Sequence, residues 1–172
     1  DELQTVSSKL NTLHKVPSDL KPIPSEVQFK EQELGNQVYF VDFDMKQVEI
    51  VMISKGEFYD NNKLPEITLY NNYFGGGMSS VVFQDLRESK ALAYSAYSTY
   101  LKPNTPKRRY INYSYIGSQA DKLAEAMKGM SDLLNQMPRA EVSFNSAKEV
   151  VLQEIRSERI TKSGILFNYE EA

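Results

Sequence analysis

The 172-residue sequence predicts an α+β domain, in which an antiparallel sheet carries helices packed on one face. Two observations predict this class. Two pairs of β-branched and aromatic runs each indicate a hairpin of strands. Each pair is followed by two segments whose apolar residues recur every three or four positions, which is the spacing of an amphipathic helix. We therefore expect the order ββααββαα over residues 38–172, preceded by a linker or N-terminal arm over residues 1–37.

The first half of the domain begins with the predicted hairpin. Residues 38–43 and 48–53 are rich in Val, Ile, Phe and Tyr, which are enriched in strands. A helix is predicted over residues 65–74, because it opens with proline and its apolar residues follow helical spacing. A second helix is predicted over residues 79–87, where a serine at either of its first two positions supplies the cap.

The second half repeats this pattern. Residues 92–101 and 108–117 are predicted strands joined by a turn that contains two prolines. Helices are predicted over residues 118–137 and 143–160, each with one apolar face. The methionines of the first of these helices are expected to lie in the core: Met127, Met130 and Met137.

The N-terminal arm is expected to contain little regular structure. A short helix is predicted over residues 7–13, and the prolines at positions 17, 22 and 24 prevent a longer one. The chain begins at Asp1 without an initiator methionine, so we expect an excised segment or a processed product. The sequence does not distinguish the bacterial periplasm from the cytoplasm.

Composition excludes several classes of site. The chain has no cysteine and one histidine, His14, so it lacks the ligands for a zinc site built from His and Cys. A Ser-His-Asp triad would have to use His14, which precedes a proline-rich stretch where a rigidly held base is not expected. The net charge of −3 does not indicate a nucleic-acid partner, and no apolar run approaches the ~18 residues that span a membrane.

Three consecutive glycines, Gly75, Gly76 and Gly77, separate the two predicted helices of the first half. Glycine permits positive φ and close approach of backbones, which a tight corner requires. A phosphate-binding loop is the other interpretation. The segment follows a helix rather than a strand and lacks both nucleotide-binding glycine patterns, so we predict a structural corner.

The stretch from Phe74 to Ser95 reads FGGGMSSVVFQDLRESKALAYS. It resembles a signature of the insulinase/pitrilysin (M16) zinc metallopeptidases, roughly G-G-G-M-S-S-x-L-F-Q-x-[IVL]-R-E-x-x-G-L-A-Y-S. The resemblance covers about twenty contiguous positions, and the predicted ββααββαα order is similar to the α/β sandwich of that family. Ala91 stands where the family usually has glycine, so we expect the turn there to differ.

The resemblance implies a role in proteolysis. In this family one domain binds zinc through an H-x-x-E-H helix, and a homologous domain closes over the peptide substrate. This chain lacks that helix, so it corresponds to the non-catalytic, C-terminal-type domain and should be inactive alone, with zinc held by its partner domain. Arg87 and Tyr94 match the Arg and Tyr that reach the substrate backbone, where they would donate hydrogen bonds to its carbonyl oxygen.

Two alternatives remain at this point. The first is an inactive scaffold subunit of a larger complex, since the resembled family includes such subunits. The second is a nucleic-acid-binding sheet, because basic residues near the second hairpin's turn accompany tyrosines on its strands. These residues are Lys102, Lys107, Arg108 and Arg109, with Tyr97, Tyr100, Tyr110 and Tyr113.

Overall fold

The chain divides by its internal contacts into two units, Asp1–Asp42 and Phe43–Ala172. The computed structural model describes residues 3–15, 17–25, 35–105, 107–159, 161–162 and 164–165. In the first unit α1 spans Leu3–Leu13, and the other described residues form neither helix nor strand. Every described residue of this unit is exposed, so the unit has no core among them.

The sheet of the second unit has three antiparallel strands in the order β1-β3-β2. They are β1 (Gln47–Phe58), β2 (Ser95–Leu101) and β3 (Arg109–Gln119). Ile50 on β1 lies opposite Ile116 on β3, and Ser98 on β2 lies opposite Ser114 on β3. The second predicted hairpin is therefore confirmed as β2 and β3.

The strand predicted over residues 38–43 is wrong. These residues form no strand, and β1 alone precedes the first helix of the sheet-bearing unit. Val38 and Phe40 are 90% and 84% exposed. A run of strand-forming residues becomes a strand only where a neighbouring strand accepts its hydrogen bonds, and the described part of the chain supplies none here.

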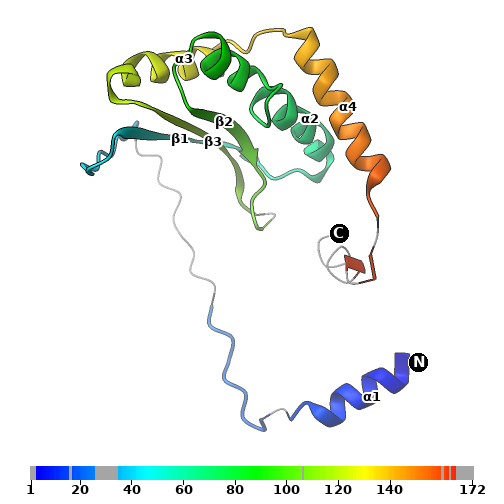
Figure 1. The fold of residues 1–172 in the computed structure, drawn as a ribbon. Coiled ribbons are helices and arrows are strands. Elements are labelled where there is room, and N and C mark those ends of the chain that lie inside the picture. The colour runs from blue at the N-terminus through cyan, green and yellow to red at the C-terminus, as the bar shows by residue number, and fades with distance from the viewer. Residues whose placement is uncertain are drawn as a thin grey trace. The chain divides into compact units, whose positions relative to one another are not determined.

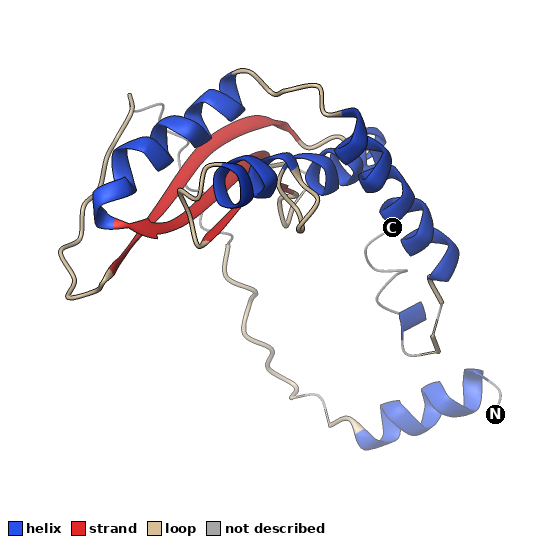
Figure 2. Cartoon of the chain, turned by 45° about the horizontal axis from the view of Figure 1, so that its top comes forward, coloured by secondary structure: helices blue, strands red, loops and turns tan. Residues whose placement is uncertain are grey.

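Helices cover one face of the sheet, as Figures 1 and 2 show. They are α2 (Leu64–Phe74), a π-helical segment (Phe83–Ser89), α3 (Leu123–Asn135) and α4 (Glu141–Ser157). α2 packs on β2, α3 packs on β3, and α4 packs on α2. The α+β class predicted from the sequence is thus confirmed.

The core lies between the sheet and these helices. Its fully buried side chains include Phe74, Val82, Leu86, Ile116 and Met130. They come from α2, from the π-helical segment and the residue that caps it, and from β3 and α3, and they form one continuous apolar cluster. Burial of that cluster supplies the main stabilisation of the fold.

The buried face of α3 differs from the predicted methionine stripe. Met127 and Met137 are 40% and 49% exposed, and only Met130 of the three is buried. The buried residues of α3 are Ala126, Gly129, Met130 and Leu133. Because a Cβ on Gly129 would lie 2.7 Å from Leu86 Cδ2, the helix approaches the π-helical segment along its smallest residues.

The three glycines form the corner after α2. A Cβ on Gly75 would lie 1.9 Å from the carbonyl oxygen of Ser98 in β2. A Cβ on Gly76 would lie 2.8 Å from the Asn71 carbonyl oxygen, and Gly77 has φ +97°. Each glycine thus occupies a position that a larger residue would fill only with strain.

Asn71 of α2 links its helix to the outer edge of β2. Its side-chain carbonyl accepts a hydrogen bond from the Tyr100 backbone N–H at 2.7 Å. Its amide nitrogen donates to the Tyr100 carbonyl oxygen at 3.1 Å. One side chain therefore satisfies both backbone groups that Tyr100 turns away from β3.

Candidate functional site

The segment between Arg87 and Tyr94 leads from the π-helical segment into β2. Leu92 and Ala93 in its middle are buried and anchor it in the core. Ala91, just before them, has φ +49°, a left-handed conformation that favours glycine. The chain therefore turns tightly at Ala91, between the π-helical segment and β2.

Three hydrogen bonds hold this turn. The Leu92 backbone N–H donates to the Leu86 carbonyl oxygen at 2.8 Å. Ser118 Oγ donates to the Leu92 carbonyl oxygen at 2.5 Å. Lys122 Nζ donates to the Ala91 carbonyl oxygen at 2.8 Å. The end of β3 and the residues that follow it therefore fix the backbone between the two candidate residues.

The guanidinium of Arg87 stays exposed. Its carbon lies 4.8 Å from the centre of the Phe83 ring, a distance that permits a cation–π contact. Its Nε lies 3.8 Å from a carboxylate oxygen of Glu88, which is also exposed. Such an exposed pair contributes little to stability, so the guanidinium keeps donors for an incoming acceptor.

Tyr94 is held at the end of the sheet. Its backbone N–H donates to the Gly117 carbonyl oxygen at 2.8 Å, which extends the β2–β3 pairing by one residue. Its phenol oxygen accepts a hydrogen bond from Gln119 Nε2 at 2.5 Å. The side chain is 50% exposed, so its hydroxyl remains within reach of a ligand.

A cavity of about 360 Å³ contains both predicted residues. Its lining is Arg87, Glu88, Ala91, Leu92, Ala93, Tyr94, Gln119 and Lys122. The two residues named from the resemblance, Arg87 and Tyr94, therefore line one cavity. Sequence reasoning missed Gln119 and Lys122, whose approach depends on the register of β3 against β2.

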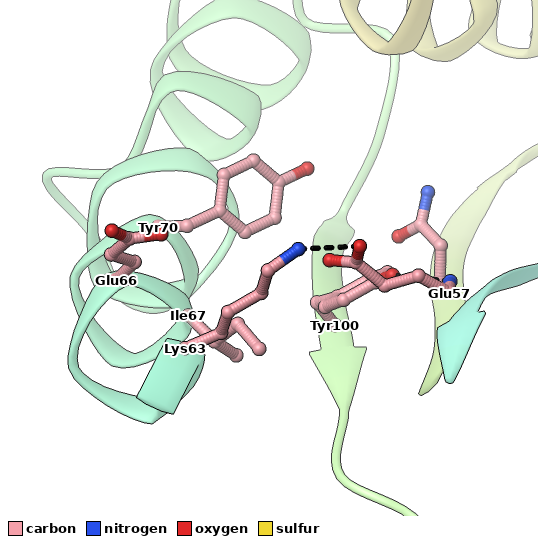
Figure 3. Close-up of a pocket in the computed structure, with 7 residues that line it drawn as sticks. Glu57, Lys63, Glu66, Ile67, Tyr70 and Tyr100 are labelled. Atoms are coloured by element: carbon pink, nitrogen blue, oxygen red, sulfur yellow. Dashed lines mark hydrogen bonds and ion pairs between the residues drawn. The ribbon is translucent and has the colours of Figure 1, made fainter. Parts of the chain in front are cut away.

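A second cavity of about 330 Å³ lies where β1 and β2 meet α2, and Figure 3 shows its lining. Lys63 Nζ pairs with a Glu57 carboxylate oxygen at 2.5 Å across it. That hydrogen bond raises the pKa of Lys63 above its usual value. In this cavity the charges of Lys63 and Glu57 neutralise each other. We therefore assign the candidate site to the other cavity, which holds Arg87 and Tyr94.

The tyrosines of the β2–β3 hairpin divide into two separate groups. Tyr97 stacks on Tyr113 with ring centres 6.2 Å apart. Tyr100 stacks on Tyr110 at 5.0 Å, and Tyr110 is fully buried, with its hydroxyl donating to the Asp60 carbonyl oxygen. Tyr97 also stacks on Tyr115 at 5.2 Å, so Tyr97 and Tyr113 belong to one stack with Tyr115, separate from the buried Tyr110.

The residues of this chain do not fit a zinc site. Zinc is held in proteins chiefly by Cys and His, and the chain has one histidine and no cysteine. Within the described ranges, no three His, Cys, Asp or Glu side chains gather where they could hold a metal ion. None of the helices built from described residues is long and apolar enough to cross a bilayer.

Two curated proteins are similar in sequence. One is an uncharacterized zinc protease of Rickettsia bellii (strain RML369-C), 28% identical over 138 residues. The other is the uncharacterized zinc protease YmxG of Bacillus subtilis (strain 168), 40% identical over 55 residues. The alignments cover 74% and 32% of this chain, but only 33% and 13% of these relatives. The chain thus spans a minor part of their length.

Two solved structures share the fold. One is a peptidase M16 inactive domain from Pseudomonas fluorescens, with TM-score 0.53 and 20% identity, covering 67% of this chain and 28% of that one. The other is a conserved protein from Enterococcus faecalis V583, with TM-score 0.52 and 18% identity, covering 73% of this chain and 29% of that one. The family described as the peptidase M16 inactive domain also matches residues 1–154, which is most of the sequence. The chain therefore belongs to the peptidase M16 family, as a domain of its inactive type.

Proposed function

We propose that this domain closes over a peptide substrate opposite a homologous zinc-binding M16 domain, and that Arg87 and Tyr94 bind the substrate backbone. The observation that carries the proposal is the cavity that both residues line. The zinc-protease names of the relatives support a proteolytic context for the whole protein. Hydrolysis itself belongs to the partner domain, because the ligands for zinc are missing from this chain.

The two side chains suit a peptide carbonyl. The Arg87 guanidinium and the Tyr94 hydroxyl are both hydrogen-bond donors. A carbonyl oxygen gains negative charge as its carbon becomes tetrahedral, so donors aimed at it stabilise the transition state more than the bound substrate. Both side chains are about half exposed, which leaves them accessible to such an oxygen.

Substitution of Tyr94 and Arg87 tests this role in the assembled protein that contains the zinc domain. Tyr94→Phe keeps the ring and removes the donor, so kcat should fall by roughly 10²–10³ with a smaller change in KM. Arg87→Ala should act in the same direction. The double variant should lose less than the product of the two effects, because both donors serve one oxygen.

Matched controls come from the opposite end of the sheet. Tyr59→Phe removes a hydroxyl that donates to Asn61 Oδ1, and Lys102→Ala removes a cation beside the hairpin turn. Both variants should retain normal kcat/KM. Normal turnover in a folded Arg87→Ala/Tyr94→Phe double variant would contradict the proposal and favour the alternative of an inactive scaffold.

A further inference from the structure

We propose that Gln119 is a positioning residue that orients the Tyr94 hydroxyl so that its proton points toward the substrate. The inference deepens the proposed function and rests on it, because it assigns the residue that aims one of the two proposed donors. The observation behind it is the 2.5 Å hydrogen bond from Gln119 Nε2 to Tyr94 Oη. Both side chains line the same cavity.

The backbone places Gln119 beside the phenol. Gln119 is the last residue of β3, and Tyr94 is paired with β3 through its bond to Gly117. Ser118, next to Gln119, donates a hydrogen bond to the Leu92 carbonyl oxygen and so holds the same turn. The Gln119 amide therefore starts from the end of a paired strand and reaches a half-exposed ring.

The direction of this hydrogen bond decides what the hydroxyl can do. A phenol has one O–H donor and an oxygen that also accepts. When the oxygen accepts from the amide, the phenol's own proton stays available for a carbonyl in the cavity. An acceptor in the place of the amide would instead take that proton, and the hydroxyl would offer the substrate a lone pair.

Gln119→Glu tests the direction without changing the size of the side chain. At neutral pH its carboxylate only accepts, so it reverses the hydrogen bond with Tyr94. In the assembled protein, kcat should fall to within about threefold of the Tyr94→Phe value, with little change in KM. Gln119→Ala removes the restraint without reversing it and should cost about tenfold.

Gln47 provides a matched control. It lies opposite Gln119 in the β1–β3 register, is exposed, and is of the same residue type. Gln47→Glu adds the same charge at the same end of the sheet and should leave kcat within about twofold of the original. Equal losses from Gln47→Glu and Gln119→Glu would mean that added charge, rather than the contact with Tyr94, lowers turnover, and the inference would be overturned.

A double variant and a spectroscopic measurement separate this inference from the proposed function. With Phe at position 94, Gln119→Glu should cause no further loss, because no hydroxyl remains to be oriented. In protein labelled with [13Cζ]tyrosine, Gln119→Glu should shift the Tyr94 resonance and Gln47→Glu should not. The resonance is assigned by its loss in Tyr94→Phe.

The outcomes are distinct. If Tyr94→Phe lowers kcat but Gln119→Glu changes neither kcat nor the resonance, the positioning role is wrong and the proposed function stands. If Gln119→Glu shifts the resonance but Tyr94→Phe leaves turnover normal, the contact exists but the proposed function fails, and the positioning role fails with it. Losses in both variants, non-additive and with the resonance shift, support the inference.

Discussion

Gly75→Ala should be the most destabilising single-methyl change in the glycine corner. The added Cβ would lie 1.9, 2.4 and 2.6 Å from the O, N and C atoms of the Ser98 backbone. Overpacking a core usually costs about 1–3 kcal/mol when side chains can shift. Here the obstacle is a strand backbone, so we expect a loss of at least about 3 kcal/mol, the upper end of that range.

The surroundings of Ser98 explain why β2 cannot easily move away from a Cβ at position 75. Ser98 is fully buried and lies opposite Ser114 in β3. The two hydroxyl oxygens of this pair are 2.8 Å apart and share a hydrogen bond. Moving β2 away from Gly75 would disturb this bond and the ladder on either side of it.

The assay is urea unfolding of the 172-residue chain followed by circular dichroism, with two comparison variants. Gly77→Ala meets no atom within 4 Å but must adopt φ +97°, so it should cost about 1–2 kcal/mol. Gly35→Ala also meets no atom within 4 Å, and its φ lies outside the left-handed region, so it should change stability by less than about 0.5 kcal/mol. In a thermal melt, where 1 kcal/mol shifts Tm by about 2–4 °C, a loss of about 3 kcal/mol in Gly75→Ala should lower Tm by about 6–12 °C. A Gly75→Ala variant as stable as Gly35→Ala would refute the reasoning.

Two further predictions concern the turn and a buried phenol. Ala91→Gly should stabilise the chain by about 0.5–1 kcal/mol, because it relieves the strain of φ +49° at a smaller entropic cost; an unchanged urea midpoint would contradict this. Burial raises the pKa of the Tyr110 hydroxyl above its usual value of 10, so the stability that its neutral form contributes is complete below about pH 10 and is lost as the pH rises further. In Tyr110→Phe, the free energy of unfolding measured by urea titration should therefore fall less steeply between about pH 10 and 11.5 than in the original chain. At pH 7 the variant should be about 1 kcal/mol less stable, because it loses the hydrogen bond to Asp60. An unchanged pH dependence would exclude Tyr110 as a source of the alkaline loss.

The sequence predicted helices and strands correctly where the local residue pattern and the tertiary environment favour the same structure. The β2–β3 hairpin and the helices after it have the expected types, because apolar spacing and proline placement report directly on local geometry. Residues 38–43 have the composition of a strand without a pairing partner. Pairing is a property of two segments, so a single run of residues does not determine it.

The face of α3 shows a second limit. Hydrophobicity selected Met127 and Met137, whereas the helix packs along Ala126 and Gly129. Close approach of two helices favours the smallest residues at their contact, and a search for hydrophobic residues does not select these. Met130 belongs both to the predicted methionine stripe and to the observed buried face of α3, and it is fully buried.

The candidate site was predictable in part. Arg87 and Tyr94 could be named because they match the Arg and Tyr of the signature that resembles the M16 peptidases. Gln119 and Lys122 join them through the strand register and the length of a lysine side chain. Neither has a local sequence signal, since a polar residue after a strand is ordinary surface composition.

The side chain of Asn71 has a consequence for how the domain meets other proteins. β2 is an edge strand, and the edges of sheets tend to recruit strands from other chains, which leads to aggregation. By occupying the outward N–H and C=O of Tyr100, Asn71 imitates a short stretch of a fourth strand and stops the sheet from growing at that point. At this position a partner must contact β2 through side chains rather than by strand addition.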